Sequence, residues 1–200
     1  MLEKEEKEWA SIEDFVTLFQ YFWHRDFPMD QKSTGARRSD WTIHTGIVVR
    51  NIADLMGFMA RFESGKRKDA VMRNTEQDVI AIEWEWEEKW GNEIEKLKSH
   101  KLWSYDKDSK RLLQYAVFIT YRPIQKIDEV YKKVLDEWKD VSWPLLLILI
   151  DIEESEEFFT QREFMKIRMS KFHEGRCTEL RSAPALPWKV PKTRWSRELK

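Results

Sequence analysis

Glu83 and Glu85 are the residues of this sequence whose type and spacing most directly indicate chemistry. They lie in residues 78–86, where apolar side chains alternate with others. Side chains alternate across a β-strand, so Ala81, Glu83 and Glu85 share one face while isoleucines and tryptophans take the other. Two carboxylates roughly 7 Å apart on a half-buried strand face repel each other. A divalent cation relieves that repulsion, and oxygen ligands favour Mg²⁺, Mn²⁺ or Ca²⁺ over zinc.

Asp69 adds a third carboxylate from the preceding strand, which we expect over residues 67–73. Residues 74–78 are rich in turn-forming side chains and connect the two strands. A turn centred near Glu76 pairs Asp69 with Glu83 across the hairpin. The sequence therefore predicts that Asp69, Glu83 and Glu85 converge. The alternative is that Glu83 and Glu85 form the solvated face of an amphipathic strand.

Hydrophobic periodicity predicts the elements around this hairpin. A helix with Ser11 as N-cap is expected to run to about Trp23, and a loop follows over residues 28–39. The second helix has an apolar stripe of Ile47, Val48, Ile52, Leu55, Met56 and Met59. Further strands are expected over residues 58–63, 112–121, 145–152 and 164–172, and further helices over residues 87–99 and 123–141.

The order strand, helix, strand over residues 112–152 predicts a parallel pair joined by a crossover. We therefore predict an α/β fold with a mixed β-sheet flanked by helices. Residues 1–39 are expected to form an N-terminal helix and loop. Residues 40–152 form the core, and residues 153–200 form a basic C-terminal extension that packs on the core.

Lys68-Asp69 followed by Glu83-Trp84-Glu85 resembles the signature of the PD-(D/E)xK nuclease superfamily. Lys68-Asp69 matches the Pro-Asp element without its proline. Glu83-Trp84-Glu85 matches the (D/E)xK element with Glu in place of Lys, as in a minority of the restriction endonucleases in that superfamily. The order of elements over residues 40–152 also resembles the family's restriction-endonuclease-like core.

This resemblance implies a Mg²⁺-dependent (or Mn²⁺-dependent) deoxyribonuclease that hydrolyses phosphodiester bonds. Asp69 and Glu83 would ligate the metal, which lowers the pKa of bound water. Glu85 would act as a base or as ligand to a second metal. Lys66, Lys68 and Lys89 are the candidates for the missing cation, and the sequence does not choose among them. The resemblance also implies a homodimer, because nucleases that cut both strands often pair two sites.

The C-terminal segment is basic although the whole chain has a net charge of -1. Residues 161–200 hold 11 Lys and Arg against four Asp and Glu, a net of +7, which leaves -8 on the first 160 residues. Such a segment suits contact with a polyanion such as DNA. Pairing with acidic residues of its own chain or of a partner subunit is the alternative. The expected nucleic-acid contacts are Lys66, Lys68, Lys166, Arg168, Lys171 and Arg176.

A non-catalytic nucleic-acid-binding or assembly protein on the same fold is the second functional hypothesis. The absent motif lysine and the many tryptophans favour it. Cys177 is the only cysteine, which excludes an intramolecular disulfide and favours a reducing cytoplasm. The first residues contain no apolar run typical of a secretory signal. The longest apolar run, Leu145–Ile150, is too short to span a membrane, so no membrane contact is expected.

Overall fold

The structure is a computed structural model that describes residues 10–29, 38–64, 68–86, 91–100, 104, 113–154 and 162–196. Within these residues the chain forms an α/β fold whose single mixed sheet is flanked by helices on both faces. No described helix is both long enough and apolar enough to cross a membrane.

The described part of the sheet has seven strands in the order β1-β2-β3-β4-β5-β6-β7. The strands are β1 (Met59–Ser64), β2 (Lys68–Arg73), β3 (Asp78–Glu85), β4 (Tyr115–Pro123), β5 (Leu145–Glu154), β6 (Arg162–His173) and β7 (Arg176–Pro184). The first three strands form an antiparallel meander, and β3, β4 and β5 run parallel. The last three strands are again antiparallel. The three parallel strands therefore lie in the centre of the sheet.

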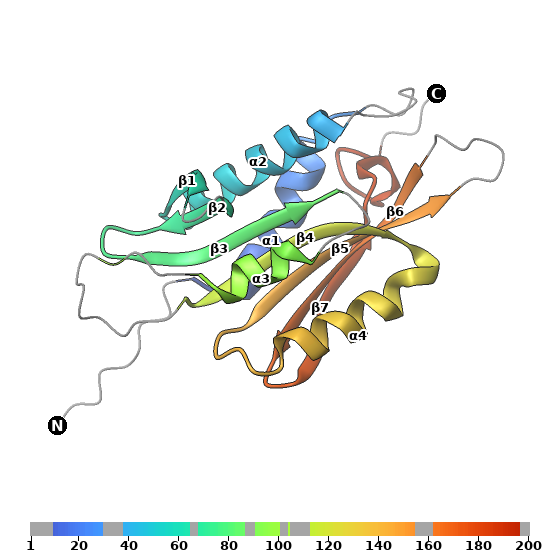
Figure 1. The fold of residues 1–200 in the computed structure, drawn as a ribbon. Helices are drawn as coiled ribbons and strands as arrows, with labels where there is room; N and C mark the ends of the chain where they lie inside the picture. The colour runs from blue at the N-terminus through green and yellow to red at the C-terminus, as the bar shows by residue number, and fades with distance from the viewer. Residues whose placement is uncertain are drawn as a thin grey trace.

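Helices cover the two faces of this sheet in pairs (Figure 1). The helices are α1 (Ile12–Arg25), α2 (Arg38–Leu55), α3 (Asn92–Lys98) and α4 (Ile127–Trp138), with short 3₁₀ turns at Ile124–Lys126 and Pro187–Lys189. One hydrophobic cluster joins α1 and α2 to the sheet, and a second joins α3 and α4 to the opposite face. The central strands are buried on both faces, which explains the nearly continuous apolar sequence of β5.

Several predicted elements are confirmed. Ser11 caps α1, and its Oγ accepts a hydrogen bond from the Asp14 backbone N–H at 3.2 Å. The predicted parallel pair is β4 with β5, and α4 provides the crossover. Val130, Val134 and Trp138 of α4 are buried. Each such side chain contributes roughly 1.5–3 kcal/mol of transfer free energy.

The predicted apolar stripe of the second helix is partly wrong. Val48 and Ile52 are buried, but Ile47 is 45% exposed and Leu55 is 66% exposed. Met59 is not in the helix at all, because the chain turns at Gly57 (φ 76°) and enters β1. One face of α2 is enough to cover this end of the sheet, so the outer part of the stripe stays in solvent.

The sequence analysis also missed β7. Glu174 and Gly175 both have positive φ, 52° and 69°, which is the backbone of a two-residue hairpin turn. This turn brings β7 back along β6, and β6 itself pairs with β5. Residues of the expected C-terminal extension are thus hydrogen-bonded members of the same sheet.

Candidate functional site

The register of the β2–β3 hairpin brings Asp69 and Glu83 to neighbouring positions on the two strands. Ala70 pairs with Ile82 and Val71 with Ala81, and Asp69 and Glu83 directly follow the pair of Ala70 and Ile82. This register is the one inferred from a turn centred near Glu76. Ala81 packs in the cluster beneath α3 and α4, so the Glu83 side chain leaves β3 on that same face.

Asp69 is half-buried and bound to the neighbouring strand. Its Oδ2 accepts a hydrogen bond of 2.7 Å from the backbone N–H of Trp84. Burial, together with the charges of Glu63 and Glu85, raises the pKa of Asp69 to about 6, and the Trp84 N–H and Lys96 act against this increase. Asp69 is therefore held in place and lies within electrostatic reach of two other carboxylates.

Glu83 is completely buried, with 0% exposure. Its Oε2 accepts a hydrogen bond of 3.0 Å from the Lys96 ammonium of α3. Its Oε1 is also buried but has no hydrogen-bond partner among the described residues. Burial and the charge of Asp69 raise the pKa of Glu83 to about 7, against the opposing effects of Lys96 and Lys68. One oxygen of a buried carboxylate is thus left for a further cation or donor.

Lys96 is the site residue that the sequence analysis missed. Burial alone lowers the pKa of its ammonium, but the hydrogen bond and charge of Glu83 raise it above its usual value, as do the charges of Asp69 and Glu93. Glu93 Oε1 lies 3.9 Å from Nζ. Ile94 and Leu97 are the buried residues of α3, and their spacing indicates which face of the helix packs inward. The position of α3 along β3 depends on tertiary packing. No local sequence pattern therefore predicted the contact between Lys96 and Glu83.

Glu85 lies at the end of β3 on the same face as Glu83 and is half-buried. Its backbone carbonyl accepts a 2.9 Å hydrogen bond from Thr120 Oγ1 of β4. Among the described residues, no three His, Cys, Asp or Glu side chains are grouped closely enough to hold a metal ion together. Asp69 interacts electrostatically with Glu83 and with Glu85, but in the described residues the three carboxylates do not form one ligand group.

Nothing matches this chain among protein-family models, curated proteins or solved structures. Mg²⁺ is commonly held by only one or two carboxylates, together with water and substrate phosphate. Asp69 and the unpartnered Oε1 of Glu83 are such a donor set, with hard oxygen ligands and excess negative charge. The residues present fit a magnesium ion.

The residues expected to contact nucleic acid differ in their exposure and in their ion pairing. Lys166 and Arg176 are exposed on β6 and β7, and Lys171 is half-buried. Arg168 Nε donates to both carboxylate oxygens of the buried Asp151, at 3.2 and 2.9 Å. Lys68 has 0% exposure, so it lies away from solvent. Lys66 and Lys89 lie outside the described residues.

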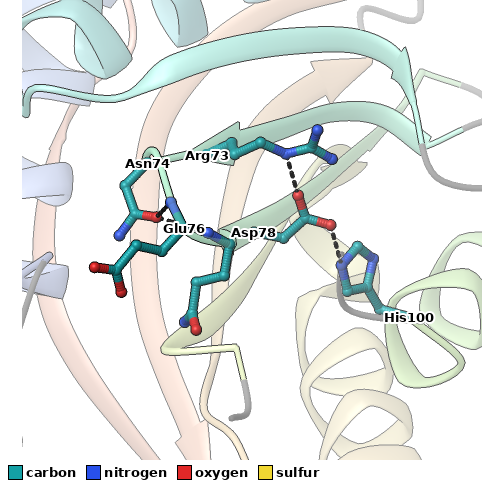
Figure 2. Close-up of polar contacts among 6 residues, drawn as sticks. Arg73, Asn74, Glu76, Asp78 and His100 are labelled. Carbon is teal, nitrogen blue, oxygen red and sulfur yellow. Dashed lines mark hydrogen bonds and ion pairs between the residues drawn. The ribbon is translucent and has the colours of Figure 1, made fainter. Parts of the chain in front are cut away.

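A second polar cluster lies at the opposite end of β3 (Figure 2). Asp78 accepts a 2.6 Å hydrogen bond from Arg73 Nε on one carboxylate oxygen, and its other oxygen is 3.2 Å from His100 Nε2. Met72 pairs with Ile80 but Arg73 pairs with Asp78, so Val79 is an extra residue in β3. This β-bulge turns Asp78 toward the face of α3, where the chain arrives at His100. The cluster joins β2, β3 and the end of α3.

Proposed function

We propose that this protein is a metal-dependent nuclease that hydrolyses phosphodiester bonds in DNA. The observation that carries the proposal is the pair of carboxylates facing each other across β2 and β3. Glu83 is fully buried, and its Oε1 has no partner among the described residues. Lys96 pairs with the other oxygen of Glu83, and a buried acceptor such as Oε1 that is left unsatisfied costs roughly 1–3 kcal/mol unless a cation or donor reaches it.

The arrangement of elements supports a restriction-endonuclease-like core over residues 40–152. The chain order α2, β1, β2, β3, α3, β4 resembles the helix, three-strand meander, helix and strand of that family, and β4 lies parallel beside β3. Asp69 on β2 and Glu83 on β3 occupy the strands that carry the PD and (D/E)xK elements. The chain departs from the family at Glu85, where the motif has lysine.

In this proposal Asp69 and Glu83 would hold a Mg²⁺ or Mn²⁺ ion. When bound, such an ion would supply a Lewis acid to the reaction. Trp84, through its backbone N–H, fixes Asp69 in the orientation that faces Glu83. Glu85 lies two residues after Glu83 on the same face of β3, and it accepts the proton of the attacking water. It is half-buried, so both water and substrate can approach it.

The exposed cations of the C-terminal strands are proposed to hold the DNA backbone. Lys166 and Arg176 are free to approach phosphates from solvent, whereas Arg168 is already paired with Asp151. Contacts of this kind depend on counterion release, so DNA affinity should fall steeply as salt increases. We also propose that the protein acts in the cytoplasm and assembles as a homodimer.

The proposal is tested with supercoiled and linear DNA incubated with Mg²⁺ or Mn²⁺. The informative variant is Glu83→Gln, which keeps the side-chain shape and removes the charge. The matched control is Glu95→Gln on α3, since the Glu95 side chain is 68% exposed and pairs only with Lys98 at 3.4 Å in the salt bridges of the described residues. We expect cleavage by the wild type and by the Glu95 variant, and none by the Glu83 variant. Equal cleavage by all three proteins would exclude this site.

A non-catalytic nucleic-acid-binding or assembly protein is the alternative, and one observation favours it. Several large apolar side chains of α2 and β1 are exposed. They include Ile43 at 62%, Ile47 at 45%, Met59 at 55% and Phe62 at 42%. Exposed apolar side chains of this kind often mark contact surfaces. A stable oligomer in analytical ultracentrifugation, with no heat of Mn²⁺ binding in calorimetry, would favour this alternative over the nuclease.

A further inference from the structure

We propose that Lys96 of α3 supplies the cation that the Glu83-Trp84-Glu85 sequence lacks, and that its ammonium faces the phosphate under attack. This inference rests on the proposed nuclease function. It assigns to a helix a charge that the motif would normally carry on β3 itself.

The geometry around Glu83 supports this assignment. Lys96 Nζ is 3.0 Å from Glu83 Oε2, and the same ammonium interacts electrostatically with Asp69. Glu83 is 0% exposed, whereas the Lys96 side chain is 35% exposed. The ammonium thus lies at the boundary between the buried carboxylate pair and solvent, which is the side from which a substrate must approach. It contacts one oxygen of Glu83 and leaves Oε1 for the metal.

Other lysines near the site are placed less suitably. Lys68 interacts electrostatically with Glu83, but it is 0% exposed. As the neighbour of Asp69 in β2, it also leaves the strand on the opposite face. Lys98 points away, to Glu95 at 3.4 Å. Within the part of the chain that the structure describes, only the Lys96 ammonium forms a salt bridge with Glu83.

Charge balance agrees with the assignment. Asp69, Glu83 and Glu85 together carry three negative charges when ionised, and one divalent ion with one ammonium neutralises them. In the reaction, water oxygen forms a bond to phosphorus and the bond from phosphorus to the leaving sugar oxygen breaks. The water proton passes to Glu85, and the leaving oxygen takes a proton from solvent. Lys96 stays protonated throughout and stabilises the charge that develops on the phosphate oxygens.

The test compares the wild type with Lys96→Met, Lys96→Arg and the control Lys98→Met on the same helix. Single-turnover cleavage of DNA is measured with Mn²⁺, and Mn²⁺ affinity is measured by calorimetry without DNA. Thermal unfolding checks that each variant is folded. We expect Lys96→Met to cleave on the order of 100-fold more slowly. It should bind Mn²⁺ no more weakly than the wild type, because a competing cation is gone. Lys96→Arg should recover part of the rate, and Lys98→Met should match the wild type.

The outcomes separate this inference from the function on which it rests. If the wild type cleaves DNA and Lys96→Met cleaves equally fast, Lys96 is not the missing cation and the nuclease proposal stands. If Lys96→Met loses Mn²⁺ binding together with cleavage, Lys96 only supports the structure and the inference is wrong. A wild type that cuts no DNA under any of these conditions would overturn both.

Discussion

Glu83 and His44 show how burial acts on single titratable residues. Glu83 is 0% exposed and His44 is 2% exposed. Removal from water disfavours the charged form in both cases, so the pKa of the acid rises and that of the base falls. The salt bridge from Lys96 does not reverse the effect at Glu83, whose pKa is raised to about 7. The ammonium of Lys96 therefore stabilises the ionised form of Glu83 only in part. This makes the Glu83 carboxylate suited to binding a second cation.

At the residue scale, we predict that His44 makes the protein sensitive to acid. Burial lowers the pKa of His44 from 6.5 to about 4, with the charge of Asp26 opposing and that of His24 adding to the decrease. Between those two values the unfolded chain binds a proton that the folded chain does not. The contribution of His44 to stability should therefore fall by roughly 3 kcal/mol as pH falls from about 6.5 to about 4.

Urea unfolding of the wild type and of His44→Phe between pH 4 and pH 7 checks this prediction. The variant keeps an aromatic ring among Trp23, Phe27 and Trp41, which contact His44 in the core. Its free energy of unfolding should vary less with pH. The pH dependence of stability that remains in the variant is partly due to His24, because burial lowers the pKa of His24 as well. The same pH slope in both proteins would contradict the assignment to His44.

At the scale of elements, local patterns predicted the hairpin well and the packing of helices poorly. Turn residues near Glu76 predicted where the β2–β3 hairpin turns, but the register also depends on the β-bulge at Val79, which lies between the pairs Arg73–Asp78 and Met72–Ile80. The contact between Lys96 and Glu83 joins elements through tertiary packing, and no turn rule reaches that far. β7 was missed because its side chains are mostly exposed, so it has no apolar alternation to detect. The Glu174-Gly175 turn was its only local signal.

The Asp78 cluster is the element-scale prediction. Asp78 is 2% exposed and accepts from Arg73 of β2, and its second oxygen contacts His100 after α3. Asp78→Asn keeps the shape but removes the buried charge that pairs with Arg73. We expect a loss of about 3 kcal/mol in the free energy of unfolding, the lower end for breaking a buried ion pair.

Urea denaturation at neutral pH measures this loss. The control is Glu76→Gln in the same turn, where the side chain is exposed and the turn hydrogen bond comes from the backbone N–H to Asn74 Oδ1 at 2.8 Å. The control should change stability by no more than about 0.5 kcal/mol. A similar small change for Asp78→Asn would mean that the cluster does not hold α3 against the sheet.

At the scale of the whole molecule, the C-terminal segment is part of the architecture. β6 covers the edge that β5 would otherwise expose, and β7 continues the sheet. The segment also contacts α1, which lies near the other end of the sequence. Trp23 Nε1 donates to the Ala185 carbonyl at 2.9 Å, and His24 Nε2 donates to the Pro184 carbonyl at 2.8 Å. Composition identified this segment as basic, but charge says nothing about strand pairing.

We therefore predict that residues 1–160 alone do not fold cooperatively. Such a chain loses buried side chains from both hydrophobic clusters, among them Ile167 and Met169 on the α1 side and Phe172 on the α4 side. It also exposes β5, an apolar strand with unpaired backbone groups that favours aggregation. The measurement is urea unfolding followed by circular dichroism, with the full chain as reference. We expect a sharp transition for the full chain and a gradual one, or precipitation, for the fragment. A sharp transition of the fragment would instead show that strands β6 and β7 are an accessory to an independent core, and the domain division at residue 152 would then hold.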